Sequence, residues 1–252
     1  MFSLKDKVIV VTGGCGILGT EFVKVIKAQN GIAIPVDIKG EWSDLGHGDV
    51  LDTHSLKPVL SRILDKYGKI DGLVNCAGGN VPEGIVGTNQ DVFDISIAGC
   101  KKAMELNIWG TIIPIQVFGP EIAKQSGSII NMSSVSSKRA LTKVLGYSMG
   151  KAALDCFTKW FAVETANRGH KCRINSICPG FFLTNQNLRL LKHEDGTLTE
   201  RGMAILQHTP LKRFGEPSEL VGALVWLLSD ESKFVTGADI VVDGGFTINS
   251  GV

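Results

Sequence analysis

Residues 7–19 read KVIVVTGGCGILG, and this stretch decides the fold that the sequence predicts. Its first half is a short β-branched run ending at Thr12, which is typical of a strand buried on both faces. Glycines follow at once, and an apolar stripe of Phe22, Val23 and Ile26 at helical spacing comes after them. A glycine-rich turn before a helix exposes backbone N–H groups at the positive end of the helix dipole, which suits a pyrophosphate. The pattern alone is weak evidence, because glycine turns after strands are common.

Asp37 strengthens this interpretation. It ends the next apolar run, residues 32–36, and lies 24 positions after Gly13. Dinucleotide-binding units place an acid on the ribose hydroxyls at an interval of about 20 residues. Because an acid there repels a 2′-phosphate, NAD is favoured over NADP, although Lys39 leaves a small opening for NADP. The alternative is that Asp37 is only a turn residue after a strand.

The rest of the chain keeps alternating between strand-like and helix-like segments. This alternation predicts an α/β fold with a doubly wound parallel sheet (Rossmann fold), in which ligands gather outside the carboxyl ends of the strands. No linker or repeat divides the chain, so residues 1–252 are expected to form a single domain, with a polar, substrate-covering loop at about 185–215. Further strands are expected at 70–75, 127–132, 173–177 and 239–242, and helices at 56–67, at 104–123 with an interruption at Pro114, around Tyr147, and at 217–228.

The composition excludes several classes of protein. With 44% hydrophobic and 20% charged residues and a net charge of +1, the chain is neither disordered nor basic enough to suggest nucleic acid. No run of about 18 apolar residues and no secretory leader is visible, so a cytoplasmic protein is the default expectation. The six cysteines are scattered without a Cys-x-x-Cys pair and are expected to be reduced, buried thiols. The five histidines show no ligand spacing, and we expect no metal.

Tyr147 and Lys151 lie four residues apart in a segment that is expected to be helical, so their side chains share one face. An ordinary tyrosine loses its proton near pH 10, and an ammonium about 4 Å away at an effective dielectric of about 20 supplies the roughly 4 kcal/mol needed to lower that value by about three units. The pair therefore suits acid/base chemistry. Taken alone, a Tyr-x-x-x-Lys spacing is more often an ordinary pair on a helix surface.

Together, these segments resemble the classical short-chain dehydrogenase/reductases over essentially the whole chain. The resemblance rests on residues 12–19, 75–78, Asn107, Ser134, 147–151, Pro179-Gly180, Thr184 and 243–245, in the order that is typical of this family. It implies a Rossmann fold, a nicotinamide cofactor and hydride transfer between that cofactor and a substrate carbonyl carbon.

The resemblance also assigns expected catalytic roles. Tyr147 resembles the general acid/base, and Lys151 the lysine that lowers the phenol's pKa and holds the nicotinamide ribose. Ser134 lies thirteen residues before the tyrosine and resembles the serine that orients the substrate oxygen. Asn107 matches the helix asparagine that passes protons by way of the lysine. Neighbouring serines 133, 136 and 137 remain alternatives to Ser134.

The cofactor residues follow from the same resemblance. Asp37 is expected to select NAD, Asp49 to lie beside the adenine, and Thr184 to bond the nicotinamide carboxamide. Ile17 stands where the family usually has glycine, and a β-branched side chain there would crowd the pyrophosphate unless the turn shifts. The expected cofactor-binding residues are Gly13, Gly16, Ile17, Leu18, Gly19, Asp37, Asp49, Val50, Asn75, Ala77, Gly78, Tyr147, Lys151, Pro179, Gly180 and Thr184.

The substrate is less directly indicated. Cations precede Tyr147 at Lys138, Arg139 and Lys143, and Arg189 follows in the next loop, where any of them could clamp a carboxylate or simply be solvated. Several further segments resemble the short-chain-type fructuronate reductases (D-mannonate oxidoreductases): residues 77–80, 141–143, 184–187, 195–199, 208–210 and 250–252. This resemblance implies that D-fructuronate is reduced to D-mannonate, with Lys143 as the carboxylate partner and Gln186 and Asn187 reading hydroxyls.

Two other functions stay open from the sequence. Another short-chain enzyme, of the 3-oxoacyl or gluconate/polyol type, would prefer an apolar or thioester-binding loop to the polar one at 185–215. A cofactor-binding sensor or scaffold without turnover would not need Asn107, Ser134, Tyr147 and Lys151 together. The family resemblance further implies a homotetramer built partly on the helix that carries Tyr147 and on residues 217–228.

Overall fold

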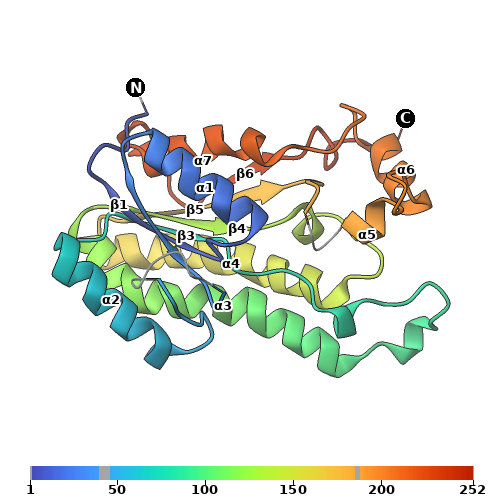
Figure 1. Ribbon diagram of the computed structural model, residues 1–252, viewed down its shortest axis with the longest axis horizontal. Helices are drawn as coiled ribbons and strands as arrows, with labels where there is room; N and C mark the ends of the chain where they lie inside the picture. Colours follow the sequence, from blue (N-terminus) through green and yellow to red (C-terminus); the bar gives the residue numbers. More distant parts are fainter. Residues whose placement is uncertain (1, 40–45, 185–187, 252) are drawn as a thin grey trace.

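The computed structural model describes residues 2–39, 46–184 and 188–251 and shows one parallel sheet between two layers of helices (Figure 1). The sheet order is β2-β1-β3-β4-β5-β6, and each pair of neighbouring strands is parallel. The order reverses beside β1, which is the switch point where doubly wound folds place their ligands. The predicted fold class is thereby confirmed. The strands are β1 (Val8–Thr12), β2 (Ile32–Val36), β3 (Gly72–Asn75), β4 (Ser128–Met132), β5 (Arg173–Pro179) and β6 (Asp239–Val242).

The helices form two layers because each buries one apolar stripe against the sheet. α1 (Ile17–Ala28) and α7 (Val221–Leu228) cover one face, while α2 (Thr53–Tyr67), α3 (Ile97–Lys124) and α4 (Leu145–Asn167) cover the other (Figure 1). Two short helices, α5 (Leu188–Leu191) and α6 (Glu200–His208), stand apart beyond the carboxyl ends of the strands. Short 3₁₀ helices span Pro82–Gly84, Val92–Asp94, Val135–Ser137, Pro217–Leu220 and Asp230–Ser232.

The interruption expected at Pro114 is wrong, because α3 runs without a break from Ile97 to Lys124 and contains both Pro114 and Pro120. Proline removes one helical hydrogen bond and crowds the preceding turn. In α3 that cost is met by tertiary packing: Pro114, Ile115 and Phe118 are buried in the core between α3, α2 and the sheet. Packing energy therefore overrides the local preference for a break.

Residues 188–215 lie between β5 and the 3₁₀ helix Pro217–Leu220 and contain α5 and α6. That this stretch covers the substrate stays a prediction from the sequence. Thr199 caps α6 by accepting a hydrogen bond from the Gly202 N–H, and its hydroxyl donates to the Leu190 carbonyl at 2.8 Å. These contacts tie the two short helices together, and residues 185–187 lie outside the described part.

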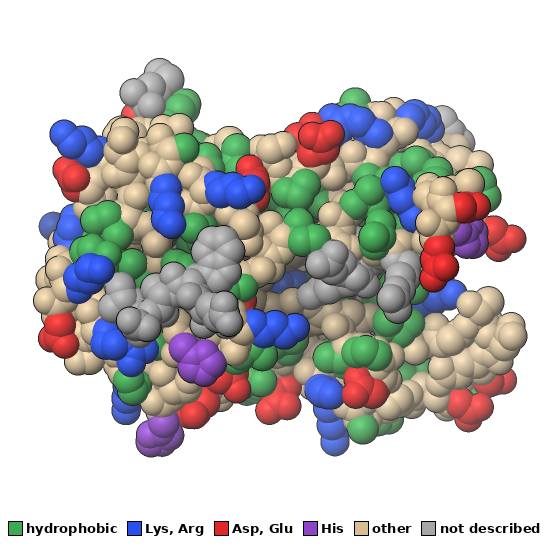
Figure 2. Space-filling model, viewed as in Figure 1, with side chains coloured by type: hydrophobic (Ala, Val, Ile, Leu, Met, Phe, Trp, Pro, Cys, Tyr) green, Lys and Arg blue, Asp and Glu red, His purple; other side chains and the backbone are tan. Residues whose placement is uncertain are grey.

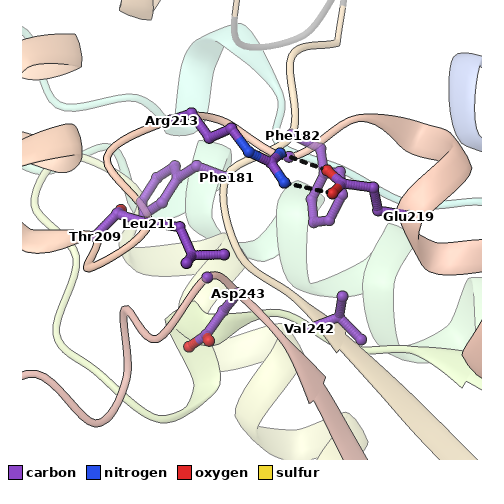
Figure 3. A pocket seen from close by; sticks show the side chains of 10 residues that line it. Phe181, Phe182, Thr209, Leu211, Arg213, Glu219, Val242 and Asp243 are labelled. Atoms are coloured by element: carbon purple, nitrogen blue, oxygen red, sulfur yellow. Dashed lines mark hydrogen bonds and ion pairs between the residues drawn. The ribbon is translucent and has the colours of Figure 1, made fainter.

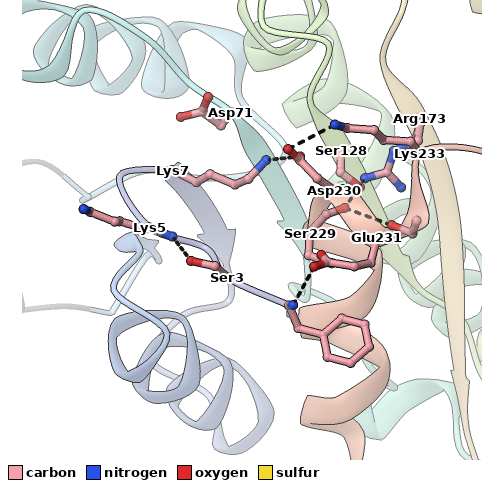
Figure 4. Close-up of polar contacts among 12 residues, drawn as sticks. Ser3, Lys5, Lys7, Asp71, Ser128, Arg173, Ser229, Asp230, Glu231 and Lys233 are labelled. Atoms are coloured by element: carbon pink, nitrogen blue, oxygen red, sulfur yellow. Dashed lines mark hydrogen bonds and ion pairs between the residues drawn. The ribbon is translucent and has the colours of Figure 1, made fainter.

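Arg173, at the start of β5, anchors the C-terminal end of α7 from inside the molecule. Its side chain is 8% exposed, and Nη2 donates to the carbonyls of Leu227 at 2.9 Å and Ser229 at 3.1 Å. The hydroxyl of Ser128 on β4 donates to the same Leu227 carbonyl at 2.7 Å. Figure 4 shows Arg173, Ser128 and Ser229 near the ion pair of Lys7 with Asp230. Because α-helices end with unpaired carbonyls, a buried cation at this point is stabilising.

The sequence predicted that the cysteines are buried thiols, and the structure agrees only in part. Cys100, Cys172 and Cys178 are buried, but Cys156 is exposed on α4, so the expectation of buried thiols is wrong for this residue. Its position on α4 points it away from the sheet, a placement that scattered spacing does not reveal. No helix among the described residues is long and apolar enough to span a bilayer.

Candidate active site

The turn between β1 and α1 is a tight cradle in which side chains would not fit. Gly13 has φ +64°, and a Cβ there would lie 2.7 Å from the Ala77 backbone nitrogen. A Cβ on Gly19 would lie 2.1 Å from the Gly13 carbonyl oxygen. The Ala77 N–H donates to Thr12 Oγ1 at 3.2 Å, which joins the ends of β1 and β3. The backbones of this turn and of the segment after β3 therefore pack too closely to admit side chains at Gly13 and Gly19.

Ile17 does not fill this turn. Gly16 caps α1 in an extended conformation, and Ile17 is the first helical residue, with 38% of its surface exposed. The following residue, Leu18, lines the candidate catalytic pocket described below. The crowding expected from a β-branched residue is avoided because the side chain projects from the first turn of the helix.

The expected adenosine-side residues come together at the end of β2. Asp37 Oδ2 accepts from the Cys15 N–H at 3.1 Å, which places the carboxylate beside the glycine turn, and Oδ1 accepts from the Lys39 N–H at 3.0 Å. The Asp37 carbonyl accepts from the Gly48 N–H at 3.1 Å and so brings the neighbouring Asp49 to the same edge. Asp49 Oδ1 accepts from the Leu51 N–H at 2.9 Å.

A pocket of about 530 Å³ opens outside the carboxyl ends of β3, β4 and β5. Its walls are formed by residues from the start of α1, from the ends of β3 and β5, and from α4, α5 and α6. Two of its described lining residues are cations, Lys151 and Arg201, and none is Asp or Glu. Expected site residues among those that line it are Leu18, Gly78, Ser134, Tyr147, Lys151, Pro179, Gly180 and Thr184.

Ser134, Tyr147 and Lys151 meet in this pocket. Ser134 follows β4 and hydrogen-bonds with the phenol of Tyr147, which stands in the first turn of α4. Lys151 lies one turn further on, 5% exposed, with Nζ 5.6 Å from the centre of the Tyr147 ring. Nζ also donates to the Met132 carbonyl at 2.7 Å, which fixes the ammonium at the end of β4. The i, i+4 spacing therefore brings both groups to one place.

The electrostatics of this trio differ from the simple pairing expected from the sequence. Burial raises the pKa of the Tyr147 phenol, and the Ser134 hydrogen bond opposes this only in part. Burial also lowers the pKa of Lys151 from 10.5 to about 8. In a buried pair, the cost of desolvating each charged form exceeds their attraction at this separation. Burial thus favours the neutral form of both the Tyr147 phenol and the Lys151 amine.

Asn107 lies behind the pocket rather than on its wall. The side chain is fully buried on α3; its Oδ1 accepts from the Gly79 N–H at 3.1 Å, and Nδ2 donates to the Gly79 carbonyl at 2.7 Å. A Cβ added to Gly78 would lie 2.9 Å from Asn107 Oδ1 and 3.4 Å from Lys151 Nζ. Asn107 therefore fixes the loop after β3 directly beside Lys151.

Comparison with known proteins agrees with this geometry. A family model described as Enoyl-(Acyl carrier protein) reductase matches residues 27–247. An oxidoreductase of Bacillus subtilis, recorded as "Uncharacterized oxidoreductase UxuB", is 40% identical and aligns over 99% of this chain and 98% of its own. The chain belongs to the short-chain dehydrogenase/reductase family. It is therefore an oxidoreductase of the class that acts on CH–OH and C=O groups with NAD(P).

Solved structures of the same family superpose closely on this short-chain dehydrogenase. An NAD-bound crystal structure from Haemophilus influenzae, provisionally described as a D-mannonate oxidoreductase, matches with a TM-score of 0.91, 35% identity and coverage of 99% of this chain and 98% of its own. The aldohexose dehydrogenase of Thermoplasma acidophilum matches with a TM-score of 0.86, 25% identity and coverage of 99% and 97%.

The cations near the active site of this dehydrogenase have different surroundings. Lys138 pairs with Asp155 and Asp239, and the Arg139 guanidinium donates to the Thr247 carbonyl. The side chains of Lys138 and Arg139 thus already have partners within the protein. Lys143 has φ +73° and donates from Nζ to Thr88 Oγ1 at 2.8 Å; it lines an outer groove of about 890 Å³ instead of the catalytic pocket.

Arg201 is the pocket residue that sequence reasoning missed. It lies in the first turn of α6, and its Nη1 and Nη2 donate to the hydroxyl of Thr142 at 2.7 Å and to its carbonyl at 3.2 Å. More than fifty residues separate Arg201 from Tyr147, and a basic residue at the start of a surface-like helix carries no local signal. Of the other predicted substrate residues, Gln186 and Asn187 lie outside the described residues.

Two other hollows lie near the catalytic pocket. A small one of about 100 Å³ lies between Phe181, Phe182 and the end of β6, and the ion pair of Arg213 with Glu219 closes one side of it (Figure 3). The outer groove shares Arg201 with the catalytic pocket. In the space-filling view, hydrophobic side chains gather on both sides of a hollow in the right half of the molecule (Figure 2). The catalytic pocket and the outer groove therefore meet at Leu141, Phe181, Leu190 and Arg201, which line both.

The lowered pKa of Lys151 predicts a specific pH dependence of stability. Below pH 8 the folded protein carries a buried ammonium at a cost, whereas between pH 8 and 10.5 the folded amine is neutral while the unfolded chain still binds the proton. Unfolding then takes up a proton, so stability rises with pH in that window. Relative to Lys151→Met, wild type should gain roughly 1 kcal/mol in unfolding free energy between pH 7 and pH 9, measured by urea denaturation. Lys159→Met, which changes an exposed lysine on the same helix, is the control. If the difference in unfolding free energy between wild type and Lys151→Met is the same at pH 7 and pH 9, the lowered pKa of Lys151 is wrong.

Proposed function

We propose that this short-chain dehydrogenase reduces a sugar acid with NADH, and that the substrate is D-fructuronate, which becomes D-mannonate. The observation that carries the proposal is a pocket holding a Ser134–Tyr147–Lys151 trio whose described wall contains two cations and no acid. The Haemophilus influenzae neighbour, provisionally described as a D-mannonate oxidoreductase with bound NAD, supports the same substrate class. The chemistry of the wall and this similarity point to an anionic substrate.

Each member of the trio has a distinct role in the proposal. Tyr147 gives its proton to the oxygen of the ketone as that oxygen gains negative charge; its raised pKa keeps the phenol protonated until then. Ser134, which hydrogen-bonds with the phenol, orients the same oxygen. Lys151 then favours the phenolate that remains, and its hydrogen bond to the Met132 carbonyl holds it in place. Asn107 positions the backbone at Gly79 beside them.

The residues present fit a dinucleotide. The glycine cradle admits no side chain at Gly13 or Gly19, and its exposed backbone suits a pyrophosphate. Asp37 at the end of β2 would bind the ribose hydroxyls, and its contact with the Cys15 N–H beside the glycine turn supports this role. Gly78, Pro179 and Thr184 line the catalytic pocket. When bound, NAD supplies or accepts the hydride, and the protein supplies position and protons.

A substrate panel tests the proposed function. Purified protein is assayed by NADH absorbance with hexuronates, keto-gluconates, acetoacetyl thioesters and neutral polyols, each with NAD(H) and NADP(H). The proposal predicts that D-fructuronate has the highest kcat/KM in the reducing direction and D-mannonate in the oxidising direction. Higher kcat/KM for an acetoacetyl thioester or for a neutral polyol would replace it with a 3-oxoacyl or polyol function.

Asp37 is expected to control the choice of cofactor. Its carboxylate lies beside the glycine turn, where it would repel a 2′-phosphate. Asp37→Ala should raise the KM for NADH and lower the ratio of kcat/KM for NADH over NADPH by about 10- to 100-fold, equivalent to roughly 1–3 kcal/mol of lost discrimination. Steady-state kinetics with both cofactors measures this, with Asp65→Ala on α2 as the control. A wild type that prefers NADPH would show that Asp37 has been misread.

We further propose that the protein acts as a homotetramer in the cytoplasm. Exposed apolar side chains on α3 and α4, among them Trp109, Met149, Trp160 and Val163, support an assembly that covers these two helices. Light scattering coupled to size-exclusion chromatography tests the stoichiometry. A monomeric mass across the micromolar range would contradict it.

A further inference from the structure

We propose that Arg201 is the specificity-determining residue of this site and binds the carboxylate of the substrate. The inference rests on the proposed sugar-acid function and adds to it the group that recognises the acid. It also replaces Lys143, the partner expected from the sequence, with a residue that the fold brings in from α6.

The first support is location. Arg201 lines the same pocket as Ser134, Tyr147 and Lys151, whereas Lys143 lines only the outer groove. Lys151 is committed beside the phenol by its bond to the Met132 carbonyl. Arg201 is therefore the described cation on the pocket wall that remains for the carboxylate of the ligand, while Lys151 acts beside the ketone oxygen.

The second support is how Arg201 is held. Each of its two terminal nitrogens donates one hydrogen bond to Thr142: Nη1 to the hydroxyl and Nη2 to the carbonyl. Thr142 belongs to the segment between Ser134 and Tyr147, so the guanidinium is fixed relative to the reacting trio. A guanidinium carries five N–H donors, and the remaining ones can form the paired bonds that carboxylates accept. The anchoring fixes the side chain without using up its capacity for an anion.

The third support is electrostatic. Arg201 is half-buried, and burial lowers its pKa with no acidic side chain acting on it in the described part of the chain. A desolvated cation without an anion is costly, and a bound carboxylate would offset that cost. Arg213, by contrast, forms an ion pair with Glu219, so its charge is already balanced within the protein.

The placement also explains the class of substrate. A hexuronate such as D-fructuronate has its ketone near one end of the carbon chain and its carboxylate at the other. The pocket has Tyr147 at the reacting position and Arg201 in the wall that opens to the outer groove. One ligand can therefore present its ketone to the phenol and its carboxylate to the guanidinium. A neutral ketose would leave the cation unpaired and so would bind less tightly.

The test compares charged and neutral ligands in three variants. Arg201→Met, Arg201→Lys and the surface control Arg168→Met are assayed with D-fructuronate and with D-fructose, which lacks the carboxylate, using NADH. We expect Arg201→Met to raise the KM for D-fructuronate by about 10- to 100-fold, the loss of a charge-assisted pair, while kcat/KM for D-fructose changes by less than about threefold. Arg201→Lys should recover part of the loss, and Arg168→Met should match wild type.

A binding measurement separates the two proposals. Isothermal titration of the NADH-loaded protein with D-mannonate and with D-mannitol requires no turnover. Wild type that binds D-mannonate over D-mannitol, with the preference lost in Arg201→Met, supports Arg201 even if D-fructuronate proves not to be reduced. Wild type that reduces D-fructuronate while Arg201→Met keeps both its KM and its preference overturns Arg201 and leaves the proposed function standing. A KM effect found with Lys143→Met and not with Arg201→Met also overturns it, as does a wild type with no preference for the anion.

Discussion

Tyr147→Phe is expected to reduce turnover of the best substrate by at least about 10³-fold while NADH binding stays within about twofold of wild type. The substitution removes only the phenol oxygen, which hydrogen-bonds with Ser134 and carries the transferable proton. Positioned acid/base catalysis is worth about 10²–10⁴ in rate. Steady-state kinetics gives the turnover, and titration of NADH fluorescence gives the binding.

The chain supplies its own control for this experiment. It has only two tyrosines, and Tyr67 stands at the end of α2, outside the pocket. Tyr67→Phe should keep wild-type kinetics. Retained turnover in Tyr147→Phe would rule out the acid/base assignment, and a shared loss of activity in both variants would indicate a folding defect instead of a chemical one.

Arg173→Met is expected to destabilise the fold by about 2–4 kcal/mol. The change removes two buried, charge-assisted bonds to the carbonyls of Leu227 and Ser229, each worth roughly 1.5–3 kcal/mol, at the end of α7. It also removes Nη1, a buried donor without a hydrogen-bond partner among the described residues, and this offsets part of the loss. Methionine keeps most of the side-chain volume, so the loss reports the polar contacts and not a cavity. Thermal denaturation should show a decrease in Tm of roughly 5–15 °C for a chain of this size.

Arg168→Met serves as the control for this effect as well. Arg168 pairs with Glu164 on the exposed end of α4, and surface pairs contribute at most about 1 kcal/mol. Its Tm should stay within about 2 °C of wild type. Equal Tm values for Arg173→Met and Arg168→Met would mean that the α7 carbonyls find other partners, and that the serines at 128 and 232 are sufficient to hold them.

Much of the fold could be predicted because its signals are local. The β-branched run before Thr12, the glycines after it and the later alternation of strand and helix patterns are read directly from neighbouring residues. The break expected at Pro114 failed for the opposite reason. Whether a helix continues through a proline depends on burial of its flanks, here by Ile115 and Phe118, and burial is a property of the folded core.

The candidate site divides in the same way. The spacing of Tyr147 and Lys151 brings their side chains together on one helix, and Ser134 reaches them because β4 ends beside α4. The direction of the pKa shifts of Tyr147 and Lys151 could not be predicted from their spacing in the sequence. Burial raises the pKa of Tyr147 and lowers that of Lys151, and the extent of burial is known only when the sheet, α4 and the loop after β3 enclose the pair.

By itself, the sequence determined the parallel sheet, the glycine cradle, the acid at the end of β2 and the helix that carries Tyr147 and Lys151, because each depends on periodicity or spacing within a few turns of chain. Whether Lys143 or Arg201 lines the pocket that holds Tyr147 could be seen only in the folded structure. Lys143 is near Tyr147 in sequence but lines the outer groove, whereas Arg201 is distant in sequence and lines the pocket with Tyr147. The physical reason is that Thr142 and α6 meet only when the chain has folded around the sheet, and two hydrogen bonds then hold the guanidinium there.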